Sequence, residues 1–363
     1  MMMSNDSSFT IAVESERWSK QTPNGITTLR SKFDRWLAEN AVAEGVDLVC
    51  STLAKSLIYR QNSGGSSKVR QVVGVSTDRE DGDVFAKVVI VADGVNSFLA
   101  KSAGMYPNFT IENLTLGAKE VLHLGRDRID ERFGLKDDAG CDIEIVGCTE
   151  NVAGGGFLYT NQETVSVGVV LSLKDLAAQK VRPESLIDRL KSHPSIEGLL
   201  AGSTLQEYSA HMIPEVKMGK GPQLASPGVL LAGDAAGSCL ASGLWLEGVN
   251  MAIGSGITAG EFAAAACKNL DSVDWTAYGR SIRKSFVGQN HHRFQRAPKL
   301  VMSDSMQRIY PKLANDIASS IFTVTDPRAK KGVIQTARSI MTESEITVRK
   351  LTIDTFKAWR AFR

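Results

Sequence analysis

Two acidic residues, Asp93 and Asp234, each follow a run of apolar residues and stand among small ones. Asp234 belongs to VLLAGDAAG, residues 229–237, and Asp93 ends the valine-rich run of VVIVADGVNS. Such a run is typical of a strand in a parallel sheet, and these sheets bind ligands beyond the carboxyl ends of their strands. A carboxylate there accepts hydrogen bonds from ligand hydroxyls, and small neighbours let the backbone approach the ligand. The alternative for Asp234 is an ordinary cap of the following helix.

The repetition of this pattern favours the ligand interpretation. Asp93-Gly94 and Gly233-Asp234 both close a predicted buried strand. If the two strands share a sheet, one extended ligand reaches both of their ends. The sequence therefore predicts a large cofactor that contacts both motifs.

The first part of the chain has an α/β pattern. Residues 30–43 have helical periodicity, and Phe33, Trp36, Leu37 and Val42 are expected on the packed face of that helix. A strand is predicted over residues 46–52, a hairpin over 56–60 and 69–77, and a further strand over 84–92. These elements lead to the motif that contains Asp93.

The middle of the chain is rich in predicted strands and the end is helical. A separate sheet is predicted from residues 115–124, 141–146, 157–160, 165–171 and 205–212, with helices near Asp130 and Glu184. The run Gly154, Gly155, Gly156 favours a turn over a close approach to a ligand. From Gly248 the pattern is helical nearly to the end.

Composition excludes several classes of protein. The chain has 363 residues, 43% of them hydrophobic, and a net charge of +2, which predicts a globular protein of two or three packed subdomains and no nucleic-acid partner. Its five cysteines show no C-x-x-C spacing, which favours a reduced, cytoplasmic setting and argues against an iron-sulfur cluster within the chain. No signal peptide is visible, and acidic residues interrupt the long apolar tract of residues 229–267, so it is not a simple membrane span.

The last third of the chain is basic. Residues 280–299 contain six Lys and Arg and no acids, and residues 328–363 contain nine Lys and Arg against three acids. A solvated helical face is the simpler interpretation. The alternative is contact with an acidic protein or with anionic lipid, supported by Val348, Leu351, Trp359 and Phe362 at near-helical spacing.

Several motifs together resemble one family. The chain is similar to the FixC type of electron-transfer flavoprotein:quinone oxidoreductases, in the FAD superfamily that also holds geranylgeranyl reductases and aromatic hydroxylases. The resemblance runs from about Leu29 to past Phe322, and is carried by LRSKFDRWLAE, VVIVADGVNSFLA, LGAKEVLHL, GGGFLYTNQETVSVGVV, YSAHMIPE and LLAGDAAG with GVNMAIGSG.

The resemblance implies a fold of the α/β class. It consists of an incomplete FAD-binding Rossmann-like domain of the glutathione-reductase type, an inserted β-rich substrate domain and a C-terminal helical region. The expected boundaries are 1–104 for the first half of the FAD-binding domain, 105–226 for the β-rich substrate or quinone domain, 227–269 for the second half of the FAD-binding domain, and 270–363 for the helical region.

The resemblance also implies FAD as the cofactor and assigns residues to it. Asp234 matches the acid placed beside the ribityl chain, and Arg30 matches an arginine directed toward the phosphates, a role that suits a guanidinium. An ordinary arginine at a helix start is the alternative for Arg30. A helix N-terminus at the isoalloxazine would stabilise the negative charge of reduced flavin. The cofactor-binding set is Arg30, Asp93, Gly94, Gly233, Asp234, Ala235, Gly237, Gly248 and Asn250.

Two departures from the family pattern stand out. No G-x-G-x-x-G follows a predicted first strand, so the chain resembles a member that lacks its first βαβ unit, and weak FAD binding is expected. The near match GSGITAG follows helical residues, and its Gly256 and Gly260 are interpreted as a close-packed helix face. Glu247 stands where some relatives carry a basic residue, which predicts a changed partner or substrate preference.

Among the histidines, His211 is a candidate catalytic residue, whereas the pair His291-His292 is not expected to bind a metal. His211, in YSAHMIPE, is the candidate catalytic residue, because the resemblance places it where it could contact a quinone or donate a proton to it. A strand histidine bonded to a neighbouring backbone is the alternative. The pair His291-His292 lacks matching ligands, so we predict no metal site there and a basic helix surface instead.

The leading functional hypothesis is an FAD-dependent oxidoreductase that relays electrons from an electron-transfer flavoprotein toward quinone or a ferredoxin-like iron-sulfur partner. The expected location is the cytoplasm or, through peripheral contact, the inner face of the membrane. The alternatives are an isoprenoid reductase of the geranylgeranyl-reductase kind and a non-catalytic truncated remnant.

Overall fold

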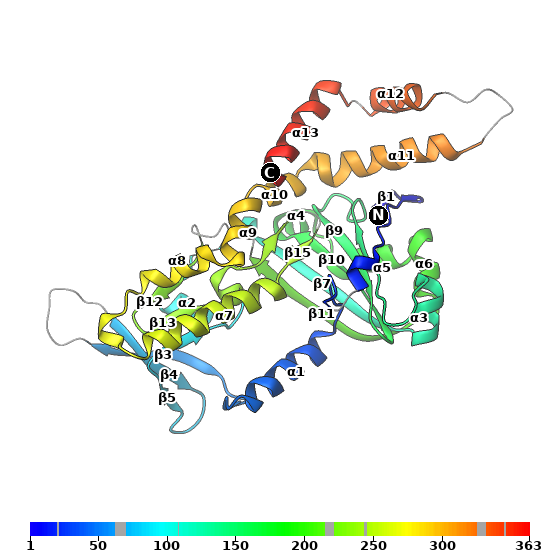
Figure 1. Cartoon of the computed structure of the whole chain (residues 1–363). Helices are drawn as coiled ribbons and strands as arrows, with labels where there is room; N and C mark the ends of the chain where they lie inside the picture. Colours follow the sequence, from blue (N-terminus) through cyan, green and yellow to red (C-terminus); the bar gives the residue numbers. More distant parts are fainter. Residues whose placement is uncertain are drawn as a thin grey trace. The chain divides into compact units, whose positions relative to one another are not determined.

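The structure is a computed structural model that describes residues 1–19, 22–61, 70–107, 109–214, 221–242, 245–324, 332–344 and 346–363. The chain forms two compact units, each assembled from separate segments of sequence (Figure 1). The first unit comprises Met1–Val46, Thr115–His211 and Lys299–Arg360, and the second Asp47–Leu114, Met212–Pro298 and Ala361–Arg363. The mixed α/β class that the sequence predicts is confirmed, whereas the domain boundaries expected at 104, 226 and 269 stay a prediction.

A five-stranded sheet is the centre of the first unit. Its strands have the order β11-β7-β10-β9-β8, and β10 pairs antiparallel with both β7 and β9. The bounds are β7 Leu114–His123, β8 Asp142–Ile145, β9 Gly154–Thr160, β10 Thr164–Ser172 and β11 Thr204–Pro214. All five predicted strands of this sheet are therefore confirmed.

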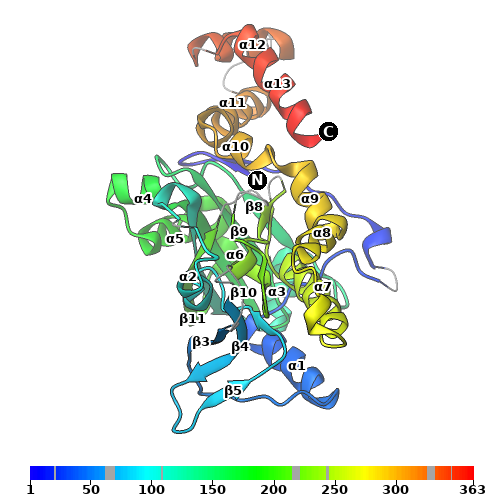
Figure 2. The same ribbon diagram turned by 90° about the vertical axis from the view of Figure 1, so that its left-hand side faces the viewer.

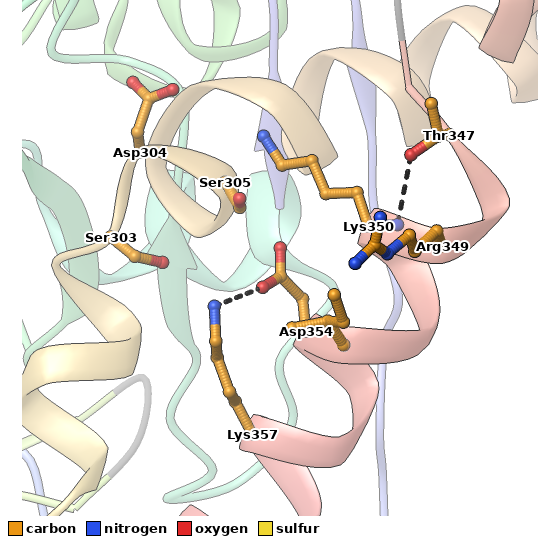
Figure 3. Close-up of a pocket in the computed structure, with 9 residues that line it drawn as sticks. Ser303, Asp304, Ser305, Thr347, Arg349, Lys350, Asp354 and Lys357 are labelled. Carbon is orange, nitrogen blue, oxygen red and sulfur yellow. Dashed lines mark hydrogen bonds and ion pairs between the residues drawn. The ribbon is translucent and has the colours of Figure 1, made fainter.

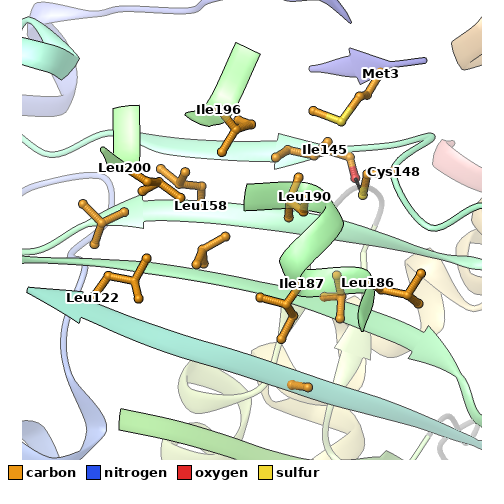
Figure 4. Close-up of a cluster of buried hydrophobic side chains, with 14 of the residues drawn as sticks. Met3, Leu122, Ile145, Cys148, Leu158, Leu186, Ile187, Leu190, Ile196 and Leu200 are labelled. Carbon is orange, nitrogen blue, oxygen red and sulfur yellow. Dashed lines mark hydrogen bonds between the residues drawn. The ribbon is translucent and has the colours of Figure 1, made fainter. Parts of the chain in front are cut away.

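Four helices pack on one face of this sheet, and Figure 4 shows the apolar side chains between them. The helices are α3 Arg126–Phe133, α4 Leu173–Gln179, α5 Pro183–Lys191 and α6 Pro194–Leu200. Because side chains alternate along a strand, Leu158 of β9 points into this core together with Ile187 and Ile196 of the helices. All three are fully buried, so their removal from water stabilises the unit at about 25 cal/mol per Å² of apolar surface.

The glycine run lies inside a strand, so the predicted turn is wrong. Gly154, Gly155 and Gly156 form the first half of β9, and each pairs with a residue of β10. A Cβ atom at Gly154 would lie 2.1 Å from the carbonyl oxygen of Val170, and one at Gly156 would lie 2.8 Å from the Cys148 sulfur. Close packing of neighbouring strands and loops therefore explains these glycines.

The second unit contains the strands that end in the two acidic motifs. β6 Val89–Val91 and β13 Val229–Leu231 pair in parallel, and β12 Ala225–Ser226 pairs antiparallel with β13. A second sheet has the order β3-β4-β5. Its strands are β3 Ala54–Gln61, β4 Arg70–Thr77 and β5 Asp83–Phe85, which confirms the predicted hairpin. The predicted strand over 46–52 is absent from the described residues, and the strand over 84–92 is interrupted between Phe85 and Val89.

Helices follow the last strand of this unit, as predicted. α7 Val249–Ala266, α8 Thr276–Lys284 and α9 Phe286–Phe294 contact one another, and both views show them side by side (Figures 1 and 2). Within α7 the close approach occurs at Gly254, where a Cβ atom would lie 2.4 Å from the Phe286 ring. Gly256 and Gly260 face open space, so the packing expected of them is wrong.

The remaining elements are short or belong to the two ends of the chain. Near the start lie β1 Met2–Met3, β2 Ser8–Phe9, η1 Glu16–Ser19 and α1 Arg30–Ala43. The short elements of the second unit are α2 Phe98–Ser102, η2 Ile111–Asn113, η3 Gly233–Ala236, β14 Leu240–Ala241, β15 Leu246–Glu247 and η4 Leu270–Ser272. The C-terminal region consists of α10 Ala297–Val301, η5 Ser305–Ile309, α11 Tyr310–Phe322, α12 Val333–Glu343 and α13 Val348–Phe362.

The predicted packed face of α1 is exposed. The helix itself forms where expected, but none of its residues is buried, and Trp36 is 56% exposed. Leu37 and Val42 are exposed as well, and Phe33 is only partly covered. Helical periodicity thus predicted the helix correctly, while the packed face expected from it is wrong.

Candidate functional site

The parallel pair β6 and β13 brings the two acidic motifs to one edge of the sheet. Val91 is paired with Leu231, and the Ala232 N–H donates to the Val91 carbonyl oxygen at 3.0 Å. Asp93 lies just beyond Ala92 after the end of β6, and Asp234 lies just beyond Ala232 and Gly233 after the end of β13. Asp93 is exposed and Asp234 is partly buried, so both carboxylates border on space outside the core.

A tight turn shapes the backbone around Asp234. Residues 233–238, called the Asp234 loop below, contain two glycines in left-handed conformation, with φ of +61° at Gly233 and +67° at Gly237. The Gly237 N–H donates to the Asp234 carbonyl oxygen at 3.0 Å, and the Ser238 N–H donates to the Gly233 carbonyl oxygen at 3.2 Å. Ala235 is buried in the core beneath the loop. Glycine is favoured at both positions because other residues rarely adopt this conformation.

The turn after Asp93 is also open to a ligand. Gly94 has a φ of +80°, and a Cβ atom built on it would meet nothing within 4 Å. The Asp93 carboxylate accepts a hydrogen bond of 3.4 Å from the N–H of Leu99 in α2. One carboxylate oxygen thus faces the helix N-terminus, and the glycine leaves room beside it.

Tyr106 lies close to both carboxylates, and sequence reasoning missed it. Its hydroxyl donates to the Val95 carbonyl oxygen at 2.5 Å. Burial raises the pKa of this phenol strongly, and the negative charges of Asp234 and Asp93 raise it further. The electrostatic effect shows that Tyr106 shares their surroundings. No feature of MYPNF in the sequence distinguishes it from an ordinary core tyrosine.

Ser238 carries a buried hydroxyl without a hydrogen-bond partner in the part of the chain that the structure describes. The residue is fully buried and directly follows Gly237. A buried hydroxyl without a partner costs about 1–3 kcal/mol, so such groups usually meet a ligand or water. Sequence reasoning missed this residue as well, although its place next to the GDAAG motif was a usable signal.

The N-terminus of α7 forms another edge of the site. Gly248 is its N-cap residue, and the Ala252 N–H donates to the Gly248 carbonyl oxygen at 2.8 Å. The exposed Asn250 donates from its side-chain amide to the Glu247 carboxylate at 2.7 Å. Glu247 therefore places a negative charge beside the positive end of the helix dipole.

The other two predicted site residues belong to the first unit. Arg30 is the first residue of α1, and its guanidinium makes two hydrogen bonds of 2.7 and 2.8 Å with the Asp34 carboxylate. The pair is exposed to solvent. His211 lies on the edge strand β11 and is exposed. All the other predicted site residues belong to the second unit, namely Asp93, Gly94, Gly233, Asp234, Ala235, Gly237, Gly248 and Asn250.

His291 contradicts the predicted basic helix surface. It is buried, and its Nε2 lies 2.8 Å from the Ser238 carbonyl oxygen, whereas His292 is exposed. Burial lowers the pKa of His291, against smaller opposite effects from this hydrogen bond and from Glu247. No group of three or more metal-binding side chains occurs among the described residues.

Two cavities lie in the first unit. One of about 490 Å³ in the C-terminal region is lined by Ser303, Asp304, Ser305, Thr347, Arg349, Lys350, Ile353, Asp354 and Lys357 (Figure 3). Lys357 and Asp354 form an ion pair of 2.9 Å at its wall. A cavity of about 380 Å³ is lined by residues of β7, α5 and α6, including Glu120 and Lys191. Neither cavity contains a predicted site residue.

Comparison with protein families identifies two segments of the chain. Residues 115–213 match the family described as ETF-QO, ubiquinone-binding, and residues 297–363 match the ETF-QO/FixC family C-terminal domain. The first segment covers the five-stranded sheet and its helices, and the second covers the C-terminal helical region.

Whole-chain relatives decide the family. The chain is 37% identical to the protein FixC of Escherichia coli O157:H7 over 301 residues, which cover 82% of this chain and 68% of that protein. The chain belongs to the ETF-QO/FixC family. FixC of Azotobacter vinelandii is 35% identical over 367 residues, 98% of this chain and 81% of that protein. The probable electron transfer flavoprotein-quinone oxidoreductase YdiS of Escherichia coli K12 is 36% identical over 302 residues, 82% of this chain and 68% of that protein.

Two solved structures share the fold of this chain. A geranylgeranyl bacteriochlorophyll reductase-like protein of Thermoplasma acidophilum superposes with a TM-score of 0.62 at 21% identity, over 87% of this chain and 74% of that one. The flavin-dependent brominase Bmp2 superposes with a TM-score of 0.52 at 15% identity, over 87% of this chain and 75% of that one. These identities show a common fold and do not favour the isoprenoid-reductase alternative over the FixC relationship.

Proposed function

We propose that this chain is an FAD-dependent oxidoreductase that relays electrons from an electron-transfer flavoprotein toward a quinone. The observation that carries the proposal is the position of Asp93 and Asp234 after neighbouring parallel strands, in a chain of the ETF-QO/FixC family. The name of the relative YdiS supports the donor, and the ubiquinone-binding description of residues 115–213 supports the acceptor.

The residues of the second unit fit FAD by their chemistry. Asp93 and Asp234 offer carboxylate oxygens to ribityl or ribose hydroxyls, and the open space at Gly94 admits a group beside them. The partnerless hydroxyl of Ser238 supplies one further hydrogen-bonding group. Gly233, Ala235 and Gly237 keep the loop small enough for close approach.

The protein residues bind and tune the cofactor. FAD, when bound, accepts and passes on electrons, and that chemistry belongs to the cofactor itself. The N–H groups at Gly248 and Asn250 and the dipole of α7 stabilise negative charge that develops next to the helix N-terminus. We also assign Arg30 to phosphate binding, on the chemistry of its guanidinium alone, which offers paired donors to an anion.

His211 is the group we assign to proton transfer. Reduction of a quinone to a quinol consumes two electrons and two protons, and an exposed imidazole on β11 donates one of these protons while solvent supplies the other. Replacement by Phe is expected to lower the rate of quinone reduction about a hundredfold and to leave FAD binding unchanged. Equal rates in stopped-flow quinone reduction would remove His211 from the mechanism.

The finer partner assignments rest on composition and exposed charge. The five cysteines show no C-x-x-C spacing, and the described residues contain no group of three or more metal-binding side chains, so we assign an iron-sulfur step to a ferredoxin-like partner. No helix among the described residues is long and apolar enough to cross a membrane. We assign peripheral contact with anionic lipid to α13, where Val348, Phe356 and Trp359 are exposed beside Arg349 and Lys350.

Sedimentation with lipid vesicles tests the membrane assignment. The chain is expected to sediment with vesicles containing phosphatidylserine and to stay in solution with phosphatidylcholine alone. The double variant Arg349→Glu, Lys350→Glu is expected to lose binding, because it reverses charge beside the exposed apolar side chains. Equal sedimentation of both proteins would contradict the assignment.

Titration with FAD tests the proposed cofactor. We expect saturable quenching of flavin fluorescence by the chain, because Asp93 and Asp234 offer carboxylate oxygens to cofactor hydroxyls. Asp234→Ala should reduce the affinity at least tenfold. Asp271→Ala, which removes an exposed carboxylate from the same unit, is the matched control and should bind like the unchanged chain. Absence of any FAD binding would favour the alternative of a non-catalytic remnant.

A further inference from the structure

Three side chains from consecutive helices hold the backbone on both sides of Asp234. The Tyr278 hydroxyl of α8 donates to the Leu231 carbonyl oxygen at 2.7 Å. The Ser255 hydroxyl of α7 accepts from the Gly233 N–H at 2.8 Å and donates to the Ala252 carbonyl oxygen at 2.9 Å. The Nε2 atom of His291 in α9 lies 2.8 Å from the Ser238 carbonyl oxygen.

These three residues, called the anchoring residues below, are removed from solvent. Tyr278 is fully buried, Ser255 is 1% exposed and His291 is 5% exposed. A hydrogen bond between buried groups is costly to break, because neither partner can turn to water instead. The backbone at residues 231–238 is therefore fixed at its start, at its first loop residue and at its end.

Each of these hydrogen bonds requires a particular protonation state of its anchoring residue. A carbonyl oxygen only accepts, so Nε2 of His291 carries the hydrogen in this contact. Burial lowers the His291 pKa, which favours the neutral imidazole. Burial likewise raises the Tyr278 pKa, so its hydroxyl stays protonated and able to donate. All three anchors are thus in the form that the hydrogen bonds require near neutral pH.

We propose that Ser255, Tyr278 and His291 are positioning residues that hold the Asp234 loop in the conformation that receives FAD. The inference rests on the proposed cofactor and assigns a role in its binding to helices that follow the GDAAG motif in sequence. None of the anchors contacts the cofactor in this scheme. Each restricts the loop before binding, so that the ordering cost does not reduce the affinity.

Amide hydrogen exchange and FAD titration, applied to the same variants, test the inference. Tyr278→Phe and Ser255→Ala each remove one hydroxyl, and His291→Leu removes the imidazole donor. We expect faster exchange at residues 233–238 in the absence of FAD, and FAD affinity lower by about tenfold for each variant. His291→Gln keeps an N–H donor and is expected to restore most of both properties.

Two matched variants control for general damage. Tyr310→Phe removes a hydroxyl that donates to Asp354 in the first unit, and His292→Leu changes the exposed neighbour of His291. Both are expected to leave loop exchange and FAD affinity unchanged. Circular dichroism confirms folding of each variant, and Ser255→Ala, the smallest change, remains informative if the larger ones unfold.

The possible outcomes separate this inference from the proposed function. If the unchanged chain binds FAD and the anchor variants bind it equally well, the anchoring role is wrong while the cofactor proposal stands. Unchanged loop exchange in Tyr278→Phe and His291→Leu would also overturn it. If loop exchange accelerates as expected but no form of the chain binds FAD, both the cofactor proposal and the cofactor role of the anchors are overturned.

Discussion

The Glu247 carboxylate accepts a hydrogen bond of 2.7 Å from the side-chain amide of Asn250, at the first turn of α7. This contact holds a negative charge beside the helix end that we assign to the flavin. The helix dipole and the carboxylate therefore act on the cofactor with opposite sign.

Removing that charge is expected to make the flavin easier to reduce. Glu247→Gln keeps a hydrogen-bonding side chain and should raise the two-electron midpoint potential by about 20–40 mV, since 30 mV corresponds to about 1.4 kcal/mol. Spectroelectrochemical titration of the FAD-loaded chain measures the shift. Glu261→Gln, which changes an exposed acid further along α7, should have little effect. A lower potential in Glu247→Gln would contradict the assigned position of the helix end.

The strand contact at Gly154 leads to a prediction on stability. Gly154→Ala is expected to reduce the free energy of unfolding by about 2–4 kcal/mol, because the added Cβ would lie 2.1 Å from the Val170 carbonyl oxygen and the strands must separate. In Gly198→Ala the new methyl group meets nothing within 4 Å, and the residue lies in α6, so a gain of up to about 1 kcal/mol is expected. Urea denaturation followed by circular dichroism compares the two variants with the unchanged chain.

Glu144 of β8 makes stability depend on pH. Burial raises the pKa of its carboxyl to about 8, and the charge of Asp142 acts in the same direction. The folded state therefore keeps the proton while the unfolded state loses it above its ordinary pKa of 4.5, so stability falls as pH rises from about 4.5 to 8. Glu144→Gln should remove this pH dependence and raise the free energy of unfolding at pH 8 by about 1–2 kcal/mol. The full pKa shift corresponds to more, but solvent screens a carboxyl that is only partly buried.

The measurement for Glu144 is urea denaturation at pH 5 and at pH 8. The difference in stability between Glu144→Gln and the unchanged chain should be small at pH 5 and large at pH 8. Glu131→Gln, at an exposed position of α3, serves as the control and should show no such dependence. A constant difference at both pH values would show that the carboxyl is ionised in the folded protein.

Lys191 and Glu120 form an ion pair of 2.8 Å in which Glu120 is nearly buried. Lys191→Met should destabilise the first unit by about 2–3 kcal/mol, because the buried carboxylate loses its cation. Adding Glu120→Leu is expected to recover most of that loss. A double-mutant cycle by thermal denaturation measures the coupling, and additive effects of the two changes would show that the pair contributes nothing.

Sequence patterns predicted the central sheet well because its core face is strictly alternating. The apolar residues of β10, such as Val165 and Val167, recur at every second position and enter one core. In α1 the apolar residues recur at near-helical spacing, yet Trp36 is exposed, since periodicity describes one helix and says nothing of its neighbours. The wrong choice of Gly256 instead of Gly254 has the same origin, because only the position of Phe286 decides which glycine is covered.

The acidic motifs could be predicted from the sequence, whereas the buried side chains that contact or surround them could not. Asp93 and Asp234 each follow an apolar run, which is a local signal. His291 and His292 are adjacent in sequence and differ by about 100° around the helix, so only packing determines that His291 is the buried one. Tyr106 and Tyr278 act through contacts with residues distant in sequence, and no local pattern reports such contacts.

The pairing of β6 with β13 also bears on how the protein folds. Val89 and Val229 are neighbours in the ladder, although the whole sequence of the five-stranded sheet lies between them. Closing so long a loop costs more conformational entropy than forming a local helix does. Long-range strand pairs of this kind therefore slow folding. We expect the edge that carries Asp93 and Asp234 to assemble late, after the intervening sheet has collapsed. During synthesis, the strand before Asp93 therefore stays unpaired until the strand before Asp234 has left the ribosome.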